Sequence, residues 1–556
     1  MEVTDLIGET GTFQNLMLVV SMYRGVMLAI NNLGASFLFP PVGHWCSRHP
    51  AHINRTIQQW KELAIPRGYS GMSGYESCWM YAMSDDGAVV NESLVRCQEW
   101  EYDHSEFWPS GTEKWSLVCE DAWKNSLPQS MYMTGMTVGF LLTGRLSDLH
   151  GRRPVLLCGL VSYVILEYAM AFVPYFWLFC FLRLLSAASL AAVNSSLTLY
   201  IETIGPGYRS RSMIAYGVSW GVGVGVLAGI SSVVPRWDYQ IVIYASMYIA
   251  PLLLWRYIIE SPKWLMTAGR YQEAERAIWD IARLNGRPDV DRRAFLKMKE
   301  MYAKEHKKEK KTMGSGVLVL FNSRTMIKFT LTNVVFQFCA AIVRYNLALS
   351  TDMFPVDAYL NYTIGAAIEV VSGCSSQLIL LYAPRKKATV ACLLLTAVSY
   401  VLLACAHKES LWVETLLMLL CRLCIGNAFN INIIYLSEMV PTSVRALATG
   451  AAQTVYGIGC AVQPFLSNAF ENQTADAAFH AVILFLATAA VLPWMETRGK
   501  PLPDFVAGIE DPTVDSVSEG EGSTLDSVSE GEGSTASTKS SVSTNLSESS
   551  TCETRV

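Results

Sequence analysis

Long apolar blocks recur along nearly the whole chain and constrain its fold more than any other feature. Each block is roughly 20 residues long, which is the length that a helix needs to cross a bilayer. Hydrophobic residues make up 51% of the chain and charged residues only 16%, against roughly a quarter in a soluble protein. A single block could be a buried core helix, but a long series of them predicts an all-α membrane protein with many spans.

The spacing of these blocks predicts twelve transmembrane helices in two halves of six. The expected spans are residues 14–40, 127–146, 154–173, 175–203, 212–235, 239–259, 325–350, 359–382, 388–406, 411–436, 446–468 and 476–495. The expected segments are an N-terminus 1–13, a first half 14–259, a hydrophilic central loop 260–324, a second half 325–495 and a tail 496–556. An even number of spans places both termini on the same side.

Positive charge is concentrated in one set of short loops. These loops hold Arg145, Arg152, Arg153, Arg209, Arg211, Arg385, Lys386, Lys387 and Arg445. The opposite short loops hold little beyond Arg236 and Lys408. Because cytosolic loops carry the excess of Lys and Arg, we expect both termini and the central loop in the cytosol of a plasma-membrane protein. Within the central loop, the helical spacing of Tyr271–Leu284 predicts a helix on the membrane surface.

The long loop 41–126 is then expected outside the cell. It contains four cysteines, Cys46, Cys78, Cys97 and Cys119. In an oxidising compartment they predict two disulfides, with three pairings open. The loop also holds two glycosylation sequons, at Asn54 and Asn91. Cysteines and sequons in the one loop that the charges place outside support this orientation.

The C-terminal tail differs in composition from the rest of the chain. From Asp504 onward it carries eleven acidic and two basic residues, so the remaining body has a net charge of about +4. A ten-residue repeat starts at Asp515 and again at Asp526, and such a low-complexity segment predicts disorder. The chain ends in Thr554, Arg555 and Val556. This ending fits the pattern that PDZ domains bind, so a cytosolic PDZ scaffold is an expected partner.

A glycine- and arginine-containing motif lies between the second and third spans. Its defining residues are Gly144, Asp148, Gly151, Arg152 and Arg153. The glycines allow a tight turn, and the aspartate and arginines can pair across closing helices. The motif resembles the signature loop of the major facilitator superfamily. We expect these five residues to act in gating.

Further stretches narrow the resemblance. They are 113–119 (EKWSLVC), 260–265 (ESPKWL), 269–274 (GRYQEA), 437–445 (SEMVPTSVR) and 496–504 (ETRGKPLPD). Together they resemble the organic cation, carnitine and organic anion transporter family within that superfamily, over residues 13 to about 505. The resemblance implies two six-helix halves, a central substrate cavity and alternating access by rocking. The second half departs from the pattern at residues 382–387 (YAPRKK), which lack the full signature.

Two further acid–base pairs repeat across the halves. Glu202 precedes Arg209, and Glu438 precedes Arg445, at the same interval and at the same end of spans four and ten. An internal repeat predicts this correspondence. We expect each pair to lock the cytosolic gate in one state.

Ionisable residues inside spans are costly and usually face a cavity. The candidates are Arg24, Glu167, Arg183, Arg344, Glu369 and Arg422. The resemblance implies that Glu369 and Arg422 face the substrate, with Arg344 and Tyr345 where the family has an aromatic pair. It also places Gly457 where the cation branch tends to carry Asp and the anion and carnitine branches Arg. We expect Arg183 to be structural and leave Arg24 and Glu167 without a role.

These features predict a carrier of small organic ions, with organic cations or carnitine-like zwitterions as the leading substrate class. An organic anion carrier is the alternative, because Arg344 and Arg422 would both lie in the cavity. A transport-dead, receptor-like relative is a third hypothesis, because cavity aromatics are lost. The sequence contains neither a metal-ligand cluster nor a nucleophile beside a base, so it predicts no enzyme, no cofactor and no nucleic-acid partner.

Overall fold

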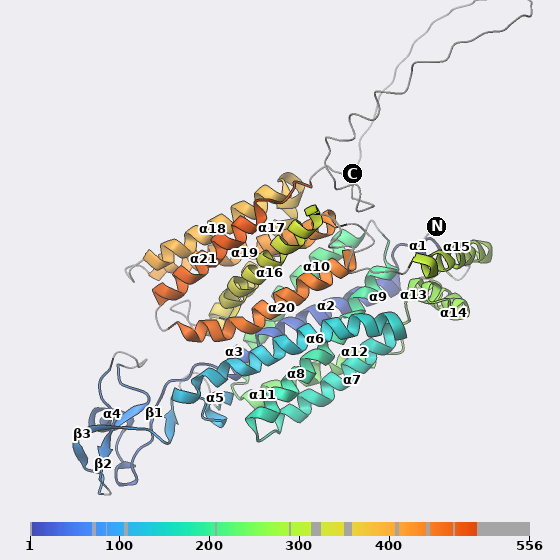
Figure 1. Cartoon of the computed structure of the whole chain (residues 1–556). Helices are drawn as coiled ribbons and strands as arrows, with labels where there is room; N and C mark the ends of the chain where they lie inside the picture. The colour runs from blue at the N-terminus through green and yellow to red at the C-terminus, as the bar shows by residue number, and fades with distance from the viewer. Residues whose placement is uncertain are drawn as a thin grey trace, which may run out of the picture. The chain divides into compact units, whose positions relative to one another are not determined.

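The computed structural model describes residues 3–68, 74–84, 86–104, 109–205, 208–287, 291–312, 324–349, 358–405, 411–440, 445–470 and 473–497. The expected PDZ-binding residues Thr554, Arg555 and Val556 lie outside these ranges. Figure 1 shows that the described part of the chain is largely helical.

Every expected span coincides with a helix or a broken pair of helices. The first half contains α2 (Thr12–Leu33), α3 (Ala35–Leu38), α6 (Leu127–His150), α7 (Arg152–Ala171), α8 (Phe176–Ala192), α9 (Ser195–Thr203), α10 (Arg209–Val233), α11 (Trp237–Met247) and α12 (Ile249–Leu253). The second half contains α16 (Arg324–Leu349), α17 (Ala358–Tyr382), α18 (Arg385–Cys405), α19 (Leu411–Met439), α20 (Arg445–Ala469) and α21 (Gln473–Val491).

Eight of these spans are long and apolar enough to cross a membrane by length and composition alone. The other four are α6, α10, α20 and the broken pair α11–α12. Helices α6, α10 and α20 take part in the most extensive contacts between the halves: α6 packs on α20, and α10 packs on α17. The small residues of α6 and α20 allow these helices to approach closely. The described part of α10 that is apolar, Gly217–Val233, is shorter than a full span.

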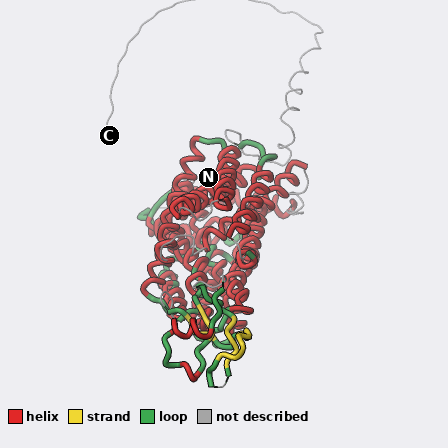
Figure 2. Tube along the Cα trace, turned by 90° about the vertical axis from the view of Figure 1, so that its left-hand side faces the viewer, coloured by secondary structure: helices red, strands yellow, loops and turns green. Residues whose placement is uncertain are grey.

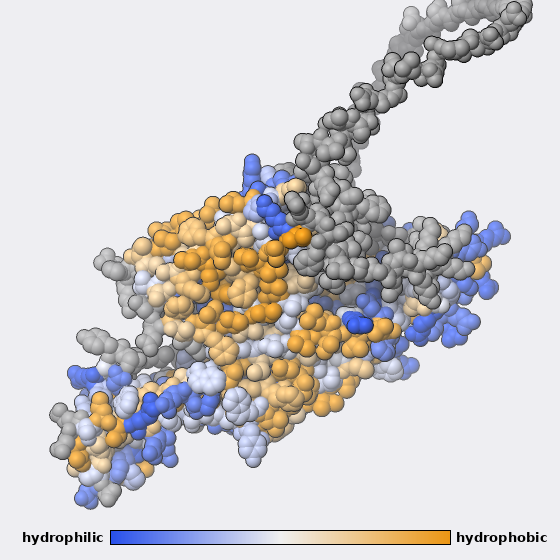
Figure 3. Space-filling model, viewed as in Figure 1, coloured by the Kyte–Doolittle hydropathy of each residue, from blue (hydrophilic) through white to orange (hydrophobic). Residues whose placement is uncertain are grey.

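Hydrophobic side chains cover the helices on the outside. Figure 3 shows hydrophobic residues over the helical part, a mixture of hydrophilic and hydrophobic residues over the strands, and hydrophilic residues over α14–α15. Leu141, Ile165 and Leu381 are among the large apolar side chains that are exposed on the helices. In a soluble protein such a surface would aggregate, whereas in a bilayer it is the surface that lipid covers.

The segment 41–126 folds as a small α/β unit. Strand β1 (His44–Cys46) pairs antiparallel with β4 (Trp100–Tyr102), and β2 (Trp79–Met83) pairs antiparallel with β3 (Val89–Arg96). Helix α4 (Ile57–Ala64) starts at a capping box and buries Trp60 against the strands. Figures 1 and 2 show this unit at one end of the transmembrane helices, which we call the loop end.

The central segment forms helices α13 (Pro262–Thr267), α14 (Tyr271–Leu284) and α15 (Arg292–Thr312). These lie opposite the loop end in Figure 1. The expected helix 271–284 is confirmed. Its apolar face packs on protein, because Ala274, Ile278 and Ile281 are buried where α14 contacts α13 and α1 (Val3–Ile7), and its predicted position on the membrane surface stays a prediction. Protein rather than lipid covers that face.

Candidate functional site

An ion pair joins α16 and α17 within the second half. Arg344 Nη2 lies 3.0 Å from Glu369 Oε2, and the two side chains remain 15% and 21% exposed. The Arg344 guanidinium also lies over the Phe429 ring, 4.7 Å from its centroid, and Phe429 lies 4.7 Å from the ring of Tyr456. Helices α16, α17, α19 and α20 thus bring charged and aromatic groups to one place that is neither fully buried nor fully open. We take this as the candidate substrate site.

Arg422 adds a second positive charge near this site. It is 9% exposed and donates a hydrogen bond to the Leu347 carbonyl. A Cβ atom at Gly365 would meet Arg422 Nη1, so a larger residue at that position would displace the guanidinium. Glu369 is close enough to Arg422 to interact with it electrostatically. Because Glu369 is already paired with Arg344, two arginines and one glutamate leave the site with excess positive charge.

Tyr345 and Gly457, which are expected at the substrate site, contact the other half of the protein, and their predicted contact with substrate stays a prediction. The Tyr345 hydroxyl lies 3.0 Å from the carbonyl of Asn32 and 2.9 Å from its Oδ1, and it also accepts a hydrogen bond from Gln129. A Cβ atom at Gly457 would lie 2.0 Å from Thr137 Oγ1, so this glycine allows α20 to approach α6. Tyr345 and Gly457 therefore hold the two halves together in this conformation.

Further contacts close the halves at the loop end. Ser126 donates to the Pro464 carbonyl at 2.9 Å, and Ser36 donates to the Leu349 carbonyl at 3.4 Å. The Phe37 ring stacks on Tyr359 of α17, with centroids 5.6 Å apart. These contacts are polar and aromatic and come from both halves. The loop end is therefore closed.

At the opposite end of the first half, part of the signature motif is exposed within the described structure. The Asp148 side chain is 72% exposed, and a Cβ atom at Gly144 would meet no other part of the described structure within 4 Å. A cleft of about 210 Å³ lies between α6 and α8–α9, lined by polar groups that include Ser147, Asn194 and Thr198. The described residues thus show contacts between the halves at the loop end and an exposed polar cleft within the first half at the other end.

The signature motif forms a charge cluster in the first half. Arg152 pairs with Glu202 at 2.9 Å and with Asp148 at 2.9 Å. Glu260 accepts the backbone N–H groups of Arg152 and Arg153 at 3.0 and 3.1 Å, so a carboxylate caps the N-terminus of α7. Gly151 has φ of 105°, and a Cβ atom there would lie 2.4 Å from that carboxylate. Glycine is needed at this turn for both reasons.

The second half repeats the cluster although its motif is degenerate. Arg385 lies 3.4 Å from Glu438, and Glu496 accepts the N–H groups of Arg385 and Lys386 at 2.8 and 3.1 Å. Thr497 donates to the second oxygen of Glu438 at 2.5 Å. Glu260 follows Glu202, and Glu496 follows Glu438, by the same 58 residues. The feature repeated in the two halves is thus an arginine that pairs with one glutamate through its side chain and donates its backbone N–H to a second glutamate.

These clusters change the interpretation of the predicted gate pairs. Glu202 and Glu438 are confirmed at the same end of the helices, but the partners that the structure shows are Arg152 and Arg385 rather than Arg209 and Arg445. The side chains of Arg209 and Arg445 lie outside the described residues, so those two pairs stay predictions. The two capping glutamates lay within quoted motifs, yet sequence reasoning assigned them no role.

A second intramembrane ion pair lies wholly within the first half. Glu167 and Arg183 are 3.4 Å apart, and their side chains are 0% and 1% exposed. Arg183 also donates to the Asn31 carbonyl at 2.9 Å and lies over the Tyr132 ring. The expectation that Arg183 is structural is confirmed. Arg24 is also buried, in α2.

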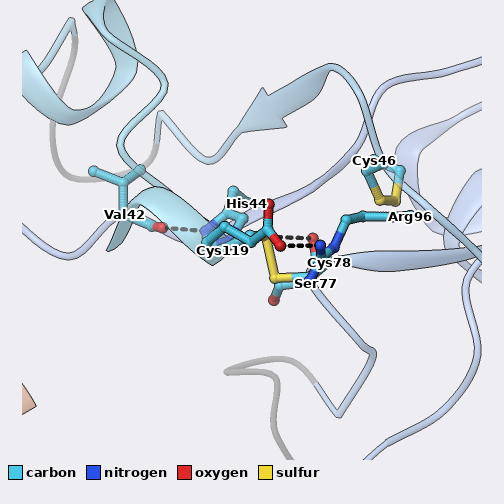
Figure 4. The surroundings of a disulfide bond; sticks show 9 residues. Val42, His44, Cys46, Ser77, Cys78, Arg96 and Cys119 are labelled. Atoms are coloured by element: carbon cyan, nitrogen blue, oxygen red, sulfur yellow. Dashed lines mark hydrogen bonds and ion pairs between the residues drawn. A yellow bond between two sulfur atoms is a disulfide. The ribbon is translucent and has the colours of Figure 1, made fainter. Parts of the chain in front are cut away.

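The four cysteines of the loop form two disulfides. They are Cys46–Cys97 and Cys78–Cys119, one of the three pairings left open by the sequence. Figure 4 shows His44 beside the Cys78–Cys119 bridge, its ring hydrogen-bonded to the Val42 carbonyl. Burial lowers the pKa of His44, with that hydrogen bond opposing the shift. His44 and the two sulfurs cluster closely enough to suggest a metal site, but sulfurs in a disulfide are not thiolate ligands.

The two sequons differ in what the structure describes. Asn54 is exposed, just before the capping box of α4, whereas Asn91 lies in β3 and its side chain is outside the described residues.

Comparisons with known proteins place this geometry in a family. The family model described as Major Facilitator Superfamily matches residues 125–464 and 375–516. Solute carrier family 22 member 6 of Bos taurus is 28% identical over 518 residues, covering 91% of this chain and 93% of that protein. The Mus musculus protein of that name is 26% identical over 510 residues, with the same coverage. Organic anion transporter 3 of Sus scrofa is 25% identical over 518 residues, covering 92% of this chain and 93% of that protein.

Solved structures show the same fold. The xylose transporter XylE from E. coli in an inward open conformation matches with a TM-score of 0.59 and 14% identity, over 88% of this chain and 98% of that one. The proton:xylose symporter XylE bound to 6-bromo-6-deoxy-D-glucose matches with a TM-score of 0.57 and 15% identity, over the same shares. The helices, the signature cluster and these matches agree: the chain belongs to the major facilitator superfamily of multi-pass membrane transporters.

Proposed function

We propose that this protein carries small organic anions across the plasma membrane by alternating access. The observation that carries the proposal is the charge of the candidate site. Arg344 neutralises Glu369 at 3.0 Å, and Arg422 is then left in excess. A net positive, aromatic-lined site inside a membrane attracts an aromatic anion and repels a cation. The relatives named organic anion transporters support the same class over the leading hypothesis from sequence, organic cations or carnitine.

The position of Arg344 offers a reason for the unusual Gly457. The resemblance assigns an arginine to that position in anion and carnitine carriers. Here Arg344 on α16 interacts electrostatically with Tyr456, the residue before Gly457. We infer that α16 supplies the positive charge that α20 supplies elsewhere in the family. Glycine at 457 then frees α20 to pack closely on Thr137.

The membrane orientation that we propose from the Lys and Arg residues of the short loops agrees with the disulfides and the sequons found at the loop end. Both termini and α13–α15 would be cytosolic, and the disulfide-bonded segment 41–126 would be extracellular. The exposed Asn54 would carry a glycan there, and Asn91 is a second candidate. In this orientation the open cleft near Asp148 faces the cytosol, and the closed contacts of Tyr345 and Ser126 face outside.

Uptake of three radiolabelled probes by cells expressing the full chain tests the substrate class. The probes are 2-naphthalenesulfonate as the aromatic anion, tetraethylammonium as the cation and carnitine as the zwitterion. We expect uptake of the sulfonate above mock-transfected cells and its loss in Arg422→Gln. Arg236→Gln, which changes an exposed arginine outside the site, is the matched control and should retain uptake. Uptake of the cation alone would reverse the proposal, and no uptake of any probe would favour the transport-dead alternative.

A further inference from the structure

A buried histidine near the start of α21 has a defined tautomer. His480 is 1% exposed, and its Nδ1 lies 2.8 Å from the backbone carbonyl of Asp476. A carbonyl only accepts hydrogen bonds, so Nδ1 carries the ring proton. In the neutral ring, Nε2 is then an unprotonated lone pair. That atom is buried and has no hydrogen-bond partner among the described residues.

Asp476 is placed to act as the counter-ion of a protonated ring. Its Oδ1 lies 3.3 Å from His480 Nδ1, and its side chain is 28% exposed. The Asp476 side chain is thus partly exposed near the loop end, although its Oδ1 is buried, and the imidazole is enclosed. A buried lone pair beside a partly exposed carboxylate is the arrangement of a site that takes up a proton.

The groups that face this pair come from four helices. Helix α18 contributes Tyr400, whose ring stacks on His480 with centroids 5.5 Å apart and planes at 19°. Helix α19 contributes Arg422 and Cys421, which interact electrostatically with Tyr400. Helices α16 and α20 contribute the amides Asn346 and Gln463, which do not titrate. The neighbouring residues 406–410 and 471–472 lie outside the described ranges.

The amide side chains connect the pair to the contacts that close the loop end. Asn346 hydrogen-bonds the Asp476 carboxylate, and Gln463 donates to Asn346 Oδ1 at 2.8 Å. Asn346 directly follows Tyr345, which bonds Asn32 of the first half. Gln463 directly precedes Pro464, whose carbonyl accepts the Ser126 hydroxyl. One hydrogen-bonded network therefore joins His480 to both backbone segments that hold the halves together.

We propose that His480 and Asp476 form a proton-binding site that is coupled to opening and closing of the loop end. A proton from solvent adds to the His480 Nε2 lone pair, no other bond breaks, and the imidazolium is neutralised by the Asp476 carboxylate. This charge pair holds Asn346 and Gln463 in the closed arrangement, so protonation stabilises the loop-closed state. Protons thereby bias the transport cycle, which is an activity beyond carriage of the organic anion.

The transport test rests on the proposed function. Uptake of 2-naphthalenesulfonate, whose charge is fixed, is measured at external pH of about 5.5, 6.5 and 7.5, the range in which histidine titrates. We expect uptake to rise by about fivefold toward acid, the lower range of coupling between two sites. His480→Asn, which retains an amide N–H near the position of Nδ1, and Asp476→Asn should both flatten the profile.

A matched control separates a proton site from a merely structural histidine. His49 lies in the segment 41–126 and caps a short 3-10 helix (Pro50–His52), a position that asparagine also caps well. His49→Asn should retain the acid stimulation of the wild type. A structural role for His480 predicts lower uptake at every pH with the same slope, and that result would overturn the proposal.

A second readout does not depend on transport. The melting temperatures of purified wild type and His480→Asn are compared over the same pH range, and Asp476→Asn replaces the latter if it does not fold. We expect the wild type to exceed the variant by more at acid pH, because the charge pair exists only when the ring is protonated. Equal gaps at all pH values contradict the proton site. If no probe is transported but the difference in melting temperature widens toward acid pH, the proposed anion transport is contradicted and the proton site is supported.

Discussion

Two intramembrane Arg–Glu pairs among the described residues use the same chemistry in opposite settings. In the first half, the side chains of Glu167 and Arg183 are 0% and 1% exposed. Arg183 also contacts a backbone carbonyl and an aromatic ring. Glu369–Arg344 in the second half is 21% and 15% exposed, beside Phe429 and near Arg422. The first pair is enclosed by its own half, whereas solvent or substrate can reach the second.

The difference shows how burial decides the role of a charge inside a membrane protein. A fully enclosed pair is retained only if its partners compensate for lost hydration, and no substrate can exchange with them. A partly exposed pair can release one partner to a ligand. We therefore assign Glu167–Arg183 to stability and Arg344–Glu369 to function, and the predictions below test that division.

The largest effect is expected from Glu167→Gln. Removing the carboxylate leaves Arg183 charged and enclosed, at a cost of about 3–5 kcal/mol. This approaches the whole stability of many domains, so we expect little folded protein at the cell surface and a clearly lower melting temperature in detergent. Asp238→Asn, which breaks an exposed pair with Arg236, is the control and should behave like the wild type. A wild-type melting temperature for Glu167→Gln would reverse the assignment.

Glu369→Gln should separate function from folding. Because the pair is partly exposed, water can hydrate the Arg344 guanidinium in place of the lost carboxylate. Surface expression should therefore stay normal. Uptake should fall by about tenfold or more, because the unpaired Arg344 would hold an anionic substrate too tightly and slow its release. Surface biotinylation and initial uptake rates of the same cells check both statements. Unchanged uptake kinetics would remove Glu369 from the site.

A smaller effect is expected at the charge clusters. Arg385→Ala and Glu438→Ala should each slow uptake severalfold, and the double variant should be no worse than either, because both break one contact. Arg152→Ala and Glu202→Ala form the matching cycle in the first half. Adding Arg445→Ala to Glu438→Ala tests the pair predicted from sequence. Additive losses would show that the residues of a pair act independently.

The smallest effect on transport is expected at the tail. Val556→Ala, or one added C-terminal glycine, should leave uptake unchanged but abolish capture of PDZ scaffolds by a peptide of the last ten residues. The apolar side chain and the free carboxylate are the two groups that such domains hold. Equal binding by the blocked peptide would show that Thr554, Arg555 and Val556 match the pattern by chance.

Part of the candidate site could be predicted from sequence because a charged side chain inside an apolar span is energetically costly and therefore rare. A glutamate or arginine inside an apolar span is conspicuous, and Glu369, Arg344 and Arg422 were all selected in this way. Phe429 and Tyr456 were missed, because an aromatic residue in a span resembles ordinary packing. His480 and Asp476 were also missed, although their four-residue interval at the start of a span places both on one helix face.

The sequence by itself determined the twelve spans, the two halves and the cysteines available for disulfides, because bilayer length and the cost of buried charge act on each segment separately. The tertiary structure decided which partners those segments meet. The pairs Arg152–Glu202, Arg385–Glu438 and Cys46–Cys97 could be known only from the folded structure. The two residues of each pair are at least fifty positions apart in the sequence. The tertiary structure also showed that Tyr345 and Gly457, which were selected as cavity residues, contact the other half, because a residue's neighbours across helices depend on packing rather than on its own span.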